Sequence, residues 1–159
     1  MTIRAETPAE QFVSDTSKAK TLGRVMAIDI GTKRIGVAVC DELRIAVRPL
    51  PPIQRGSWKH FLQEVRRLIA ELEASALVIG MPLRLDGSEG DAATSVRQLA
   101  EKFGRSLSIP VYLQDERLTT LSARDNLKAA GRNIKEIAEQ IDSEAAAIIL
   151  RDFINNTQR

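Results

Sequence analysis

The sequence has few cysteines and no long apolar runs, and these absences exclude several classes of protein. Cys40 is its only cysteine in 159 residues, which excludes an internal disulfide and a cysteine-based zinc site and fits a reducing compartment. No run approaches the roughly 18 consecutive apolar residues of a membrane-spanning helix. Residues 1–20 also lack the apolar core of a signal peptide. We therefore expect a cytoplasmic protein with no membrane partner.

The net charge is small, and the sequence contains a single histidine. The formal net charge is +2, so any nucleic-acid binding must come from a local basic patch. His60 is the single histidine and lies beside Lys59, off the apolar face of its predicted helix, so we assign it no catalytic role. With 43% hydrophobic residues, a chain of 159 residues can form one domain with a core, but not two ordinary domains.

Hydrophobic patterning divides the chain into a tail and one α/β domain. Residues 1–22 are polar and lack periodicity, which predicts a flexible N-terminal extension, and the domain is expected to span residues 23–159. Three antiparallel strands should come first, followed by two strands that alternate with helices. The expected strands cover 25–39 as a hairpin, 45–47, 76–79 and 109–114; the expected helices cover 57–73, 91 to about 104, 119 or 120 to 131, and 135–155. Pro49, Pro51 and Pro52 are expected to end the third strand, and Asp91 to cap a helix.

The hairpin at 25–39 carries an acid where a buried strand should carry an aliphatic residue. Asp29 stands between Ile28 and Ile30, and burying a carboxylate costs several kcal/mol unless it is paired or bound to a cation. The turn that follows adds backbone amides and positive charge beside this acid, through Gly31, Thr32, Lys33 and Arg34. This grouping suits a metal ion and a phosphate. An aspartate that caps its own turn explains the residues equally well, so both interpretations stay open here.

Two further polar segments follow predicted buried strands. The loop 80–90 combines three glycines with Arg84, and the carboxyl ends of such strands form ligand-binding crevices in α/β sheets. An ordinary connector is the alternative. The segment DERLTT, residues 115–120, places Asp115, Glu116 and Arg117 after the fifth strand. These acids can serve a site, or Asp115 can pair with Arg117 at the surface.

The last predicted helix contains an acid on its apolar side. At 100° per residue, Asp142 projects beside Ile149 and small alanines, whereas Glu144 borders Arg151 on a wetter flank. Asp142 is therefore the acid expected to be buried with room beside it. Asp152 also projects onto the apolar face, but it lies near the chain end, where helices fray, so we do not assign it to the site.

Four segments in series resemble one family. AIDIGTKRIGVAV, VIGMPLRLDGSEG, DERLTT and DSEAAAIIL resemble the corresponding segments of YqgF-type proteins, the bacterial Holliday-junction-resolvase-like nucleases with a ribonuclease H-like fold. The resemblance covers about residues 24–155. It implies a mixed five-stranded sheet in the order 3-2-1-4-5 with helices on both faces. It also implies a nuclease that processes the 5′ end of precursor 16S rRNA or, as the alternative, cleaves junction DNA.

The resemblance further implies an acidic metal site made by Asp29, the DER acid and Asp142. Two Mg²⁺ or Mn²⁺ ions roughly 3.5–4 Å apart can activate a water and stabilise charge on the attacking and leaving oxygens. Such cations prefer oxygen ligands, so acids without histidine or cysteine are suitable. In the implied strand order the fifth strand lies roughly 10 Å from the first. We therefore expect the longer Glu116, rather than Asp115, to join the site, although the sequence leaves both open.

Basic residues around these acids are the expected contacts to phosphates of a nucleic acid. They are Lys33, Arg34, Arg84 and Arg117. The sequence does not distinguish RNA from DNA as the substrate, or a monomer from a homodimer.

Two other functions remain open at this point. The pattern DxGTxxxG is also the phosphate-binding hairpin of actin-like ATPases and sugar kinases, and here it is matched by Asp29, Gly31, Thr32 and Gly36. Those proteins generally close two such domains over a nucleotide, whereas this chain has one. A non-catalytic RNA-binding factor with the same fold is the other alternative.

Overall fold

The computed structural model describes residues 23–116 and 134–157, and within 134–142 it describes the backbone alone. The expected N-terminal extension, the expected helix at 119–131 and Arg117 lie outside these residues. In the described part of the chain, no helix is both long enough and apolar enough to cross a bilayer.

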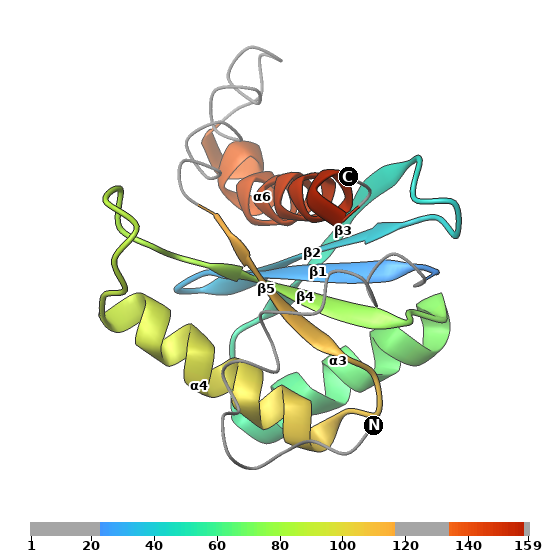
Figure 1. The fold of residues 1–159 in the computed structure, drawn as a ribbon, viewed down its shortest axis with the longest axis horizontal. Coiled ribbons are helices and arrows are strands. Elements are labelled where there is room, and N and C mark those ends of the chain that lie inside the picture. Colours follow the sequence, from blue (N-terminus) through green and yellow to red (C-terminus); the bar gives the residue numbers. More distant parts are fainter. Residues whose placement is uncertain (1–22, 117–133, 158–159) are drawn as a thin grey trace.

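A five-stranded mixed sheet forms the centre of the molecule, in the order β3-β2-β1-β4-β5 (Figure 1). The pairs β1–β2 and β2–β3 are antiparallel, whereas β4 pairs parallel to β1 and β5 pairs parallel to β4. The predicted order 3-2-1-4-5 is confirmed. The strands are β1 (Val25–Ile30), β2 (Arg34–Cys40), β3 (Val47–Gln54), β4 (Ala76–Met81) and β5 (Val111–Asp115).

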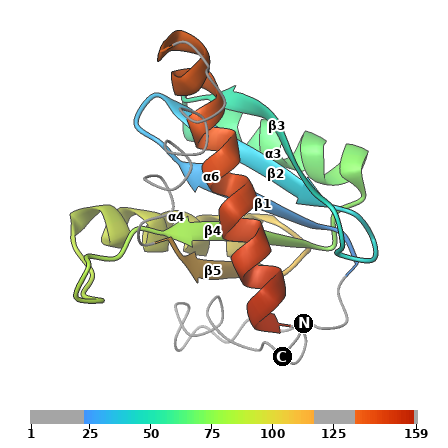
Figure 2. The ribbon, with the colours of Figure 1, turned by 90° about the horizontal axis from the view of Figure 1, so that it is seen from above.

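Helices cover both faces of the sheet, as the resemblance implied. Helices α3 (Trp58–Leu72) and α4 (Asp91–Ser106) lie on one face, and α6 (Ile134–Thr157) lies on the other (Figure 1). Figure 2 shows α6 crossing the strands obliquely rather than following one of them. Its Ser143 contacts β2 and β3, and its Phe153 packs on Tyr112 of β5, so one helix links both ends of the strand order.

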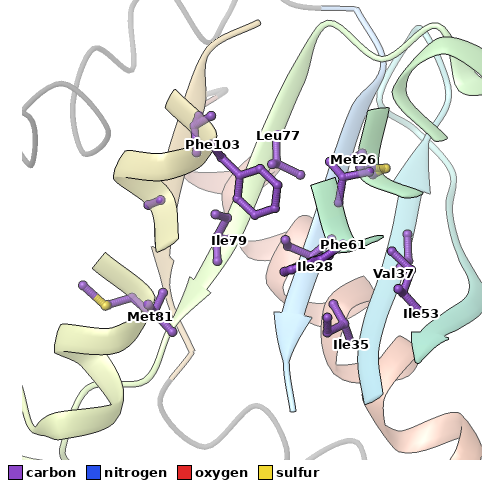
Figure 3. Close-up of a cluster of buried hydrophobic side chains, with 14 of the residues drawn as sticks. Met26, Ile28, Ile35, Val37, Ile53, Phe61, Leu77, Ile79, Met81 and Phe103 are labelled. Atoms are coloured by element: carbon purple, nitrogen blue, oxygen red, sulfur yellow. The ribbon is translucent and has the colours of Figure 1, made fainter. Parts of the chain in front are cut away.

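Alternation along the strands divides the core into two layers. Met26 and Ile28 of β1 face α3 and α4, where the rings of Phe61 and Phe103 pack edge to face with centroids 5.1 Å apart (Figure 3). Val25 and Ala27 face α6 instead. The same alternation places Asp29 on the α6 side of the sheet.

Strand β3 differs from the prediction in both its position and its prolines. The expected strand at 45–47 should have ended at Pro49, but β3 extends through all three prolines to Gln54. The prediction was wrong because β3 is at the edge of the sheet formed by the described strands, paired with β2, and an edge strand tolerates residues without an N–H. Pro51 and Pro52 also fall where the pairing with β2 shifts register, which removes the demand for regular hydrogen bonds.

Helix α3 begins one residue after its predicted start, and α4 begins at Asp91 with a different cap from the one predicted. Ser57 caps α3, its hydroxyl accepting a hydrogen bond from the His60 amide at 3.1 Å. The cap of α4 is Gly90 and not Asp91, which is the first helical residue. An acid is favourable in a first helical turn because it faces the positive end of the helix dipole, so Asp91 suits that position without capping.

Candidate active site

The carboxyl ends of β1, β4 and β5 meet at one edge of the sheet because the three strands are parallel. Ile28 is in register with Ile79, so Asp29 and Gly80 follow at the same level on adjacent strands. Gly80 is in turn in register with Gln114 of β5. An acid, a glycine and the end of β5 therefore lie side by side beneath α6.

Asp29 is buried at this edge, with 7% of its surface exposed. It sits opposite Gly36 of β2, and its own carbonyl accepts a hydrogen bond from the Gly31 amide at 3.1 Å, which closes the tight turn after β1. The side chain belongs to the α6 side of the sheet. There it is hydrogen-bonded to Glu116, which comes from the far side of β4.

Glu116 reaches Asp29 because the first residue after β5 is anchored to β4. Its amide donates to the carbonyl of Met81 at 3.1 Å, and its side chain turns back over Gly80. Burial raises the pKa of Glu116 to about 9, and the hydrogen bond with Asp29 and the charges of Asp29 and Asp115 act in the same direction. The structure thus brings together Asp29 and Glu116, two of the acids expected in the site.

One oxygen of this pair has no hydrogen-bond partner among the described residues. Oε2 of Glu116 is buried and accepts no hydrogen bond in the described part of the chain. Two close carboxyl groups with an unsatisfied buried oxygen are costly as anions, since each repels the other and burial reduces their hydration. A divalent cation relieves both costs, so these two residues fit a metal site.

The third expected ligand, Asp142, lies where the structure describes only the backbone. The next residue, Ser143, fixes α6 over the sheet: its hydroxyl donates to the carbonyl of Leu50 at 2.6 Å and accepts from the amide of Val37 at 3.4 Å. Asp142 precedes Ile149 by seven residues, about two helical turns on the same side of α6. Among the described residues, no three histidine, cysteine, aspartate or glutamate side chains form a group that could hold a metal ion.

Asp152 is an acid that the sequence analysis left out of the site. It lies in the last part of α6, where burial raises its pKa and the charge of Asp115 raises it further. Fraying is not observed there, because α6 continues to Thr157, whose hydroxyl donates to the carbonyls of Phe153 and Ile154 at 2.9 and 3.1 Å. The projection of Asp152 onto the apolar face of the helix was the signal that could have identified it as a partly buried acid near Asp115.

Basic residues surround the same edge. Lys33 lies in the turn between β1 and β2, as predicted, whereas Arg34, which was expected in the same turn, is the first residue of β2. Arg55, which the sequence analysis did not single out, ties the end of β3 to this turn: its amide donates to the Lys33 carbonyl at 3.1 Å and its Nη1 to the Gly31 carbonyl at 2.6 Å.

Arg84 lies in the loop between β4 and α4, and the loop folds around it. Its amide donates to the Ser88 carbonyl at 2.9 Å, and its guanidinium lies over Gly90, 3.2 Å from where a Cβ would stand. The side chain is exposed on the carboxyl side of β4. The loop is thus held in a defined turn by backbone hydrogen bonds.

The fold belongs to the ribonuclease H-like class, with acids at the carboxyl edge of a 3-2-1-4-5 sheet. A solved structure with a similar fold is the fowlpox virus resolvase in complex with Holliday junction DNA, with a TM-score of 0.54, 10% identity and coverage of 86% of this chain and 99% of that chain. At that identity the likeness concerns the fold alone.

Sequence comparison assigns the family. Residues 23–156 match the family model described as "RuvX: Holliday junction resolvase", and the chain belongs to this family. A relative from Anaeromyxobacter sp. (strain Fw109-5) is 36% identical over 132 residues, which cover 83% of this chain and 96% of the relative. Another from Pelagibacter ubique (strain HTCC1062) is 33% identical over 147 residues, covering 91% and 95%. Both are named "Putative pre-16S rRNA nuclease". The predicted family resemblance is confirmed.

Proposed function

We propose that the protein is a metal-dependent endonuclease that hydrolyses phosphodiester bonds in structured nucleic acid, with the 5′-end processing of precursor 16S rRNA as its role in the cytoplasm. The observation that carries this proposal is the buried, hydrogen-bonded pair of Asp29 and Glu116 at the carboxyl edge of the sheet. The names of the relatives support the substrate.

Asp29, Glu116 and Asp142 are the residues that would hold Mg²⁺ or Mn²⁺. Bound divalent ions supply an activated water and stabilise charge on the oxygens of the scissile phosphate. The protein contributes a fixed pair of carboxylates: Asp29 is held by the turn after β1, and Glu116 by its amide bond to Met81. Deprotonation of Glu116 accompanies metal binding, because its buried carboxyl otherwise retains a proton.

The basic residues would hold the nucleic acid against this pair. Lys33 and Arg34 follow β1 and Arg84 follows β4, so they flank the carboxyl edge on either side of Asp29, and Arg55 is hydrogen-bonded to the backbone of the turn at Gly31 and Lys33. Arg117 follows Glu116 directly in the sequence and is proposed to contact the same strand. Phosphate contacts of this kind position a substrate without selecting its sequence.

Cleavage of branched DNA is the second candidate activity. It is favoured by the description of the family model, a Holliday junction resolvase. The hairpin DxGTxxxG keeps nucleotide binding as a more distant alternative, but the chain supplies only one such domain, with the Asp29 carboxyl already engaged by Glu116.

A side-by-side cleavage assay separates these activities. A precursor 16S rRNA fragment and a four-way DNA junction should be incubated with the full chain, with Mn²⁺ and with EDTA. We expect Mn²⁺-dependent cleavage of the rRNA fragment at the boundary of the mature 5′ end. Preferential cleavage of the junction would favour the resolvase activity instead, and binding of either substrate without metal-dependent cleavage would indicate a non-catalytic factor.

A further inference from the structure

Gly80 is a glycine inside a strand, where glycine is normally unfavourable. It is the fifth residue of β4, a central strand paired on both sides. Its backbone does not require glycine, because among the described residues only Gly87 is a glycine with a positive φ. The reason for a glycine at this position must therefore lie in the space above it.

That space is filled by two side chains from other elements. A Cβ on Gly80 would come closer than 3.0 Å both to Oε2 of Glu116 and to Cδ1 of Ile149, and would stand 3.2 Å from Cδ of Glu116. Real Cβ atoms essentially never make contacts under 3.0 Å. Ile149 belongs to α6 and is fully buried in the core between this helix and the sheet, so it has little room to move away.

The position of Gly80 also lies on the path that Glu116 must take. Glu116 follows β5 and Asp29 ends β1, and β4 lies between these two strands. Glu116 is fixed by its amide bond to Met81, the neighbour of Gly80, so its side chain can reach Asp29 only by crossing directly over Gly80. Any side chain at this position would occupy the crossing.

We propose that Gly80 is a positioning residue of the acidic site. Because it has no side chain, it leaves a space between β4 and Ile149, and the side chain of Glu116 extends through this space to its hydrogen bond with Asp29. The steric part of this inference stands without a bound metal. Its consequence for metal binding rests on the proposed function, in which the Asp29–Glu116 pair holds the cation.

The steric part is tested on the metal-free protein by a double-mutant cycle in EDTA. Gly80→Ala should lower the urea midpoint of unfolding in a background that carries Ile149→Val, which removes the Cδ1 atom and its clash. In a background with both Ile149→Val and Glu116→Ala, the same Gly80→Ala change should no longer lower the midpoint, since the second clash is gone. An equal loss in both backgrounds would overturn the inference, because Gly80 would then not act through Glu116.

The consequence for the site is tested by calorimetric titration with Mn²⁺ alone. Gly80→Ala/Ile149→Val should bind Mn²⁺ at least tenfold more weakly than wild type, whereas Ile149→Val should bind it as wild type does. Gly23→Ala is the matched control, because a Cβ there meets only Ser75 Oγ at an ordinary 3.5 Å. Wild-type affinity in Gly80→Ala/Ile149→Val would refute a positioning role. If wild type itself bound no Mn²⁺, the proposed function would fail, and the cycle in EDTA would still decide whether Gly80 positions Glu116.

Discussion

The side chains of Asp29 and Glu116 are hydrogen-bonded to each other across the width of β4, although they come from strands that are not neighbours. Two carboxyl groups in this arrangement share a proton when no cation is present. A divalent cation must displace that proton to bind. Stability, metal binding and catalysis should therefore all depend on the same pair.

Metal-free stability should decrease as pH rises through the neutral range. The pKa of Glu116 is raised from 4.5 in an exposed chain to about 9 in the folded protein, chiefly by burial. A raised pKa means that the folded state holds the proton more tightly. Its contribution to stability is complete below the lower value and is lost as pH approaches the upper one, at up to about 1.4 kcal/mol per pH unit.

Glu116→Gln removes this dependence, because glutamine is neutral at every pH. Urea unfolding in EDTA between pH 5 and pH 9 should show a declining stability for wild type and a flatter profile for Glu116→Gln. Parallel profiles for the two proteins would show that Glu116 titrates normally and is not buried against Asp29.

Divalent metal should stabilise wild type much more than Asp142→Asn. If Asp142 completes the site, its removal lowers the charge repulsion in the metal-free protein, so Asp142→Asn should be at least as stable as wild type in EDTA. It should then lose most of the metal-induced gain, which arises by mass action from binding to the folded state. Thermal unfolding with EDTA and with Mn²⁺ measures both effects.

Glu144→Gln is the control for this experiment, since it changes the same charge two residues away. Glu144 forms an ion pair with Arg151 at 3.4 Å, on the wetter flank expected from the helical projection. Its substitution should alter neither the metal-free stability nor the metal-induced shift by much. Equal metal-induced shifts in wild type and Asp142→Asn would remove Asp142 from the site.

Loss of the basic residues should weaken nucleic-acid binding and reduce its salt dependence. Each phosphate contact that is lost should lower the slope of log affinity against log salt by about one. Lys33→Ala/Arg34→Ala should therefore bind a precursor rRNA fragment more weakly and with a flatter slope, as measured by fluorescence anisotropy in EDTA from low to moderate salt. An unchanged slope would mean that this turn does not contact phosphates.

Ser143→Ala should destabilise the protein by about 1–3 kcal/mol, the cost of leaving a buried polar group without its partner. The Ser143 hydroxyl joins α6 to the carbonyl of Leu50 and the amide of Val37. The loss should be visible as a lower urea midpoint in EDTA. A midpoint equal to that of wild type would show that packing alone holds α6 in place.

The positions of most described strands and helices could be predicted from the hydrophobic pattern, because this pattern depends directly on which side chains are buried. Asp29 stood out in the sequence for the same reason: an acid in an otherwise aliphatic strand is costly without a partner. The prolines of β3 misled the prediction because sequence does not reveal which strand lies at an edge. Asp152 was set aside because the helical projection does not show what holds a helix end, here the hydrogen bonds within α6 from the Thr157 hydroxyl to the carbonyls of Phe153 and Ile154.

The meeting of Asp29 with Glu116 could be predicted only in part. Side-chain length favoured Glu116 over Asp115, but the path over Gly80 depends on the register of β4 with both neighbours and on the height of α6 above it. These are three-dimensional relationships between segments far apart in sequence. The one sign of them in the sequence was Gly80, the glycine that directly follows the predicted strand at 76–79.

The central claim is tested most directly by the rate at which Asp29→Asn cleaves a precursor 16S rRNA fragment in Mn²⁺. This change removes a ligand charge with almost no change of shape, so urea unfolding in EDTA should first establish that the variant is folded. The account predicts that folded Asp29→Asn protein cleaves at the rate of the metal-free control. Cleavage by the folded variant at the wild-type rate would contradict it.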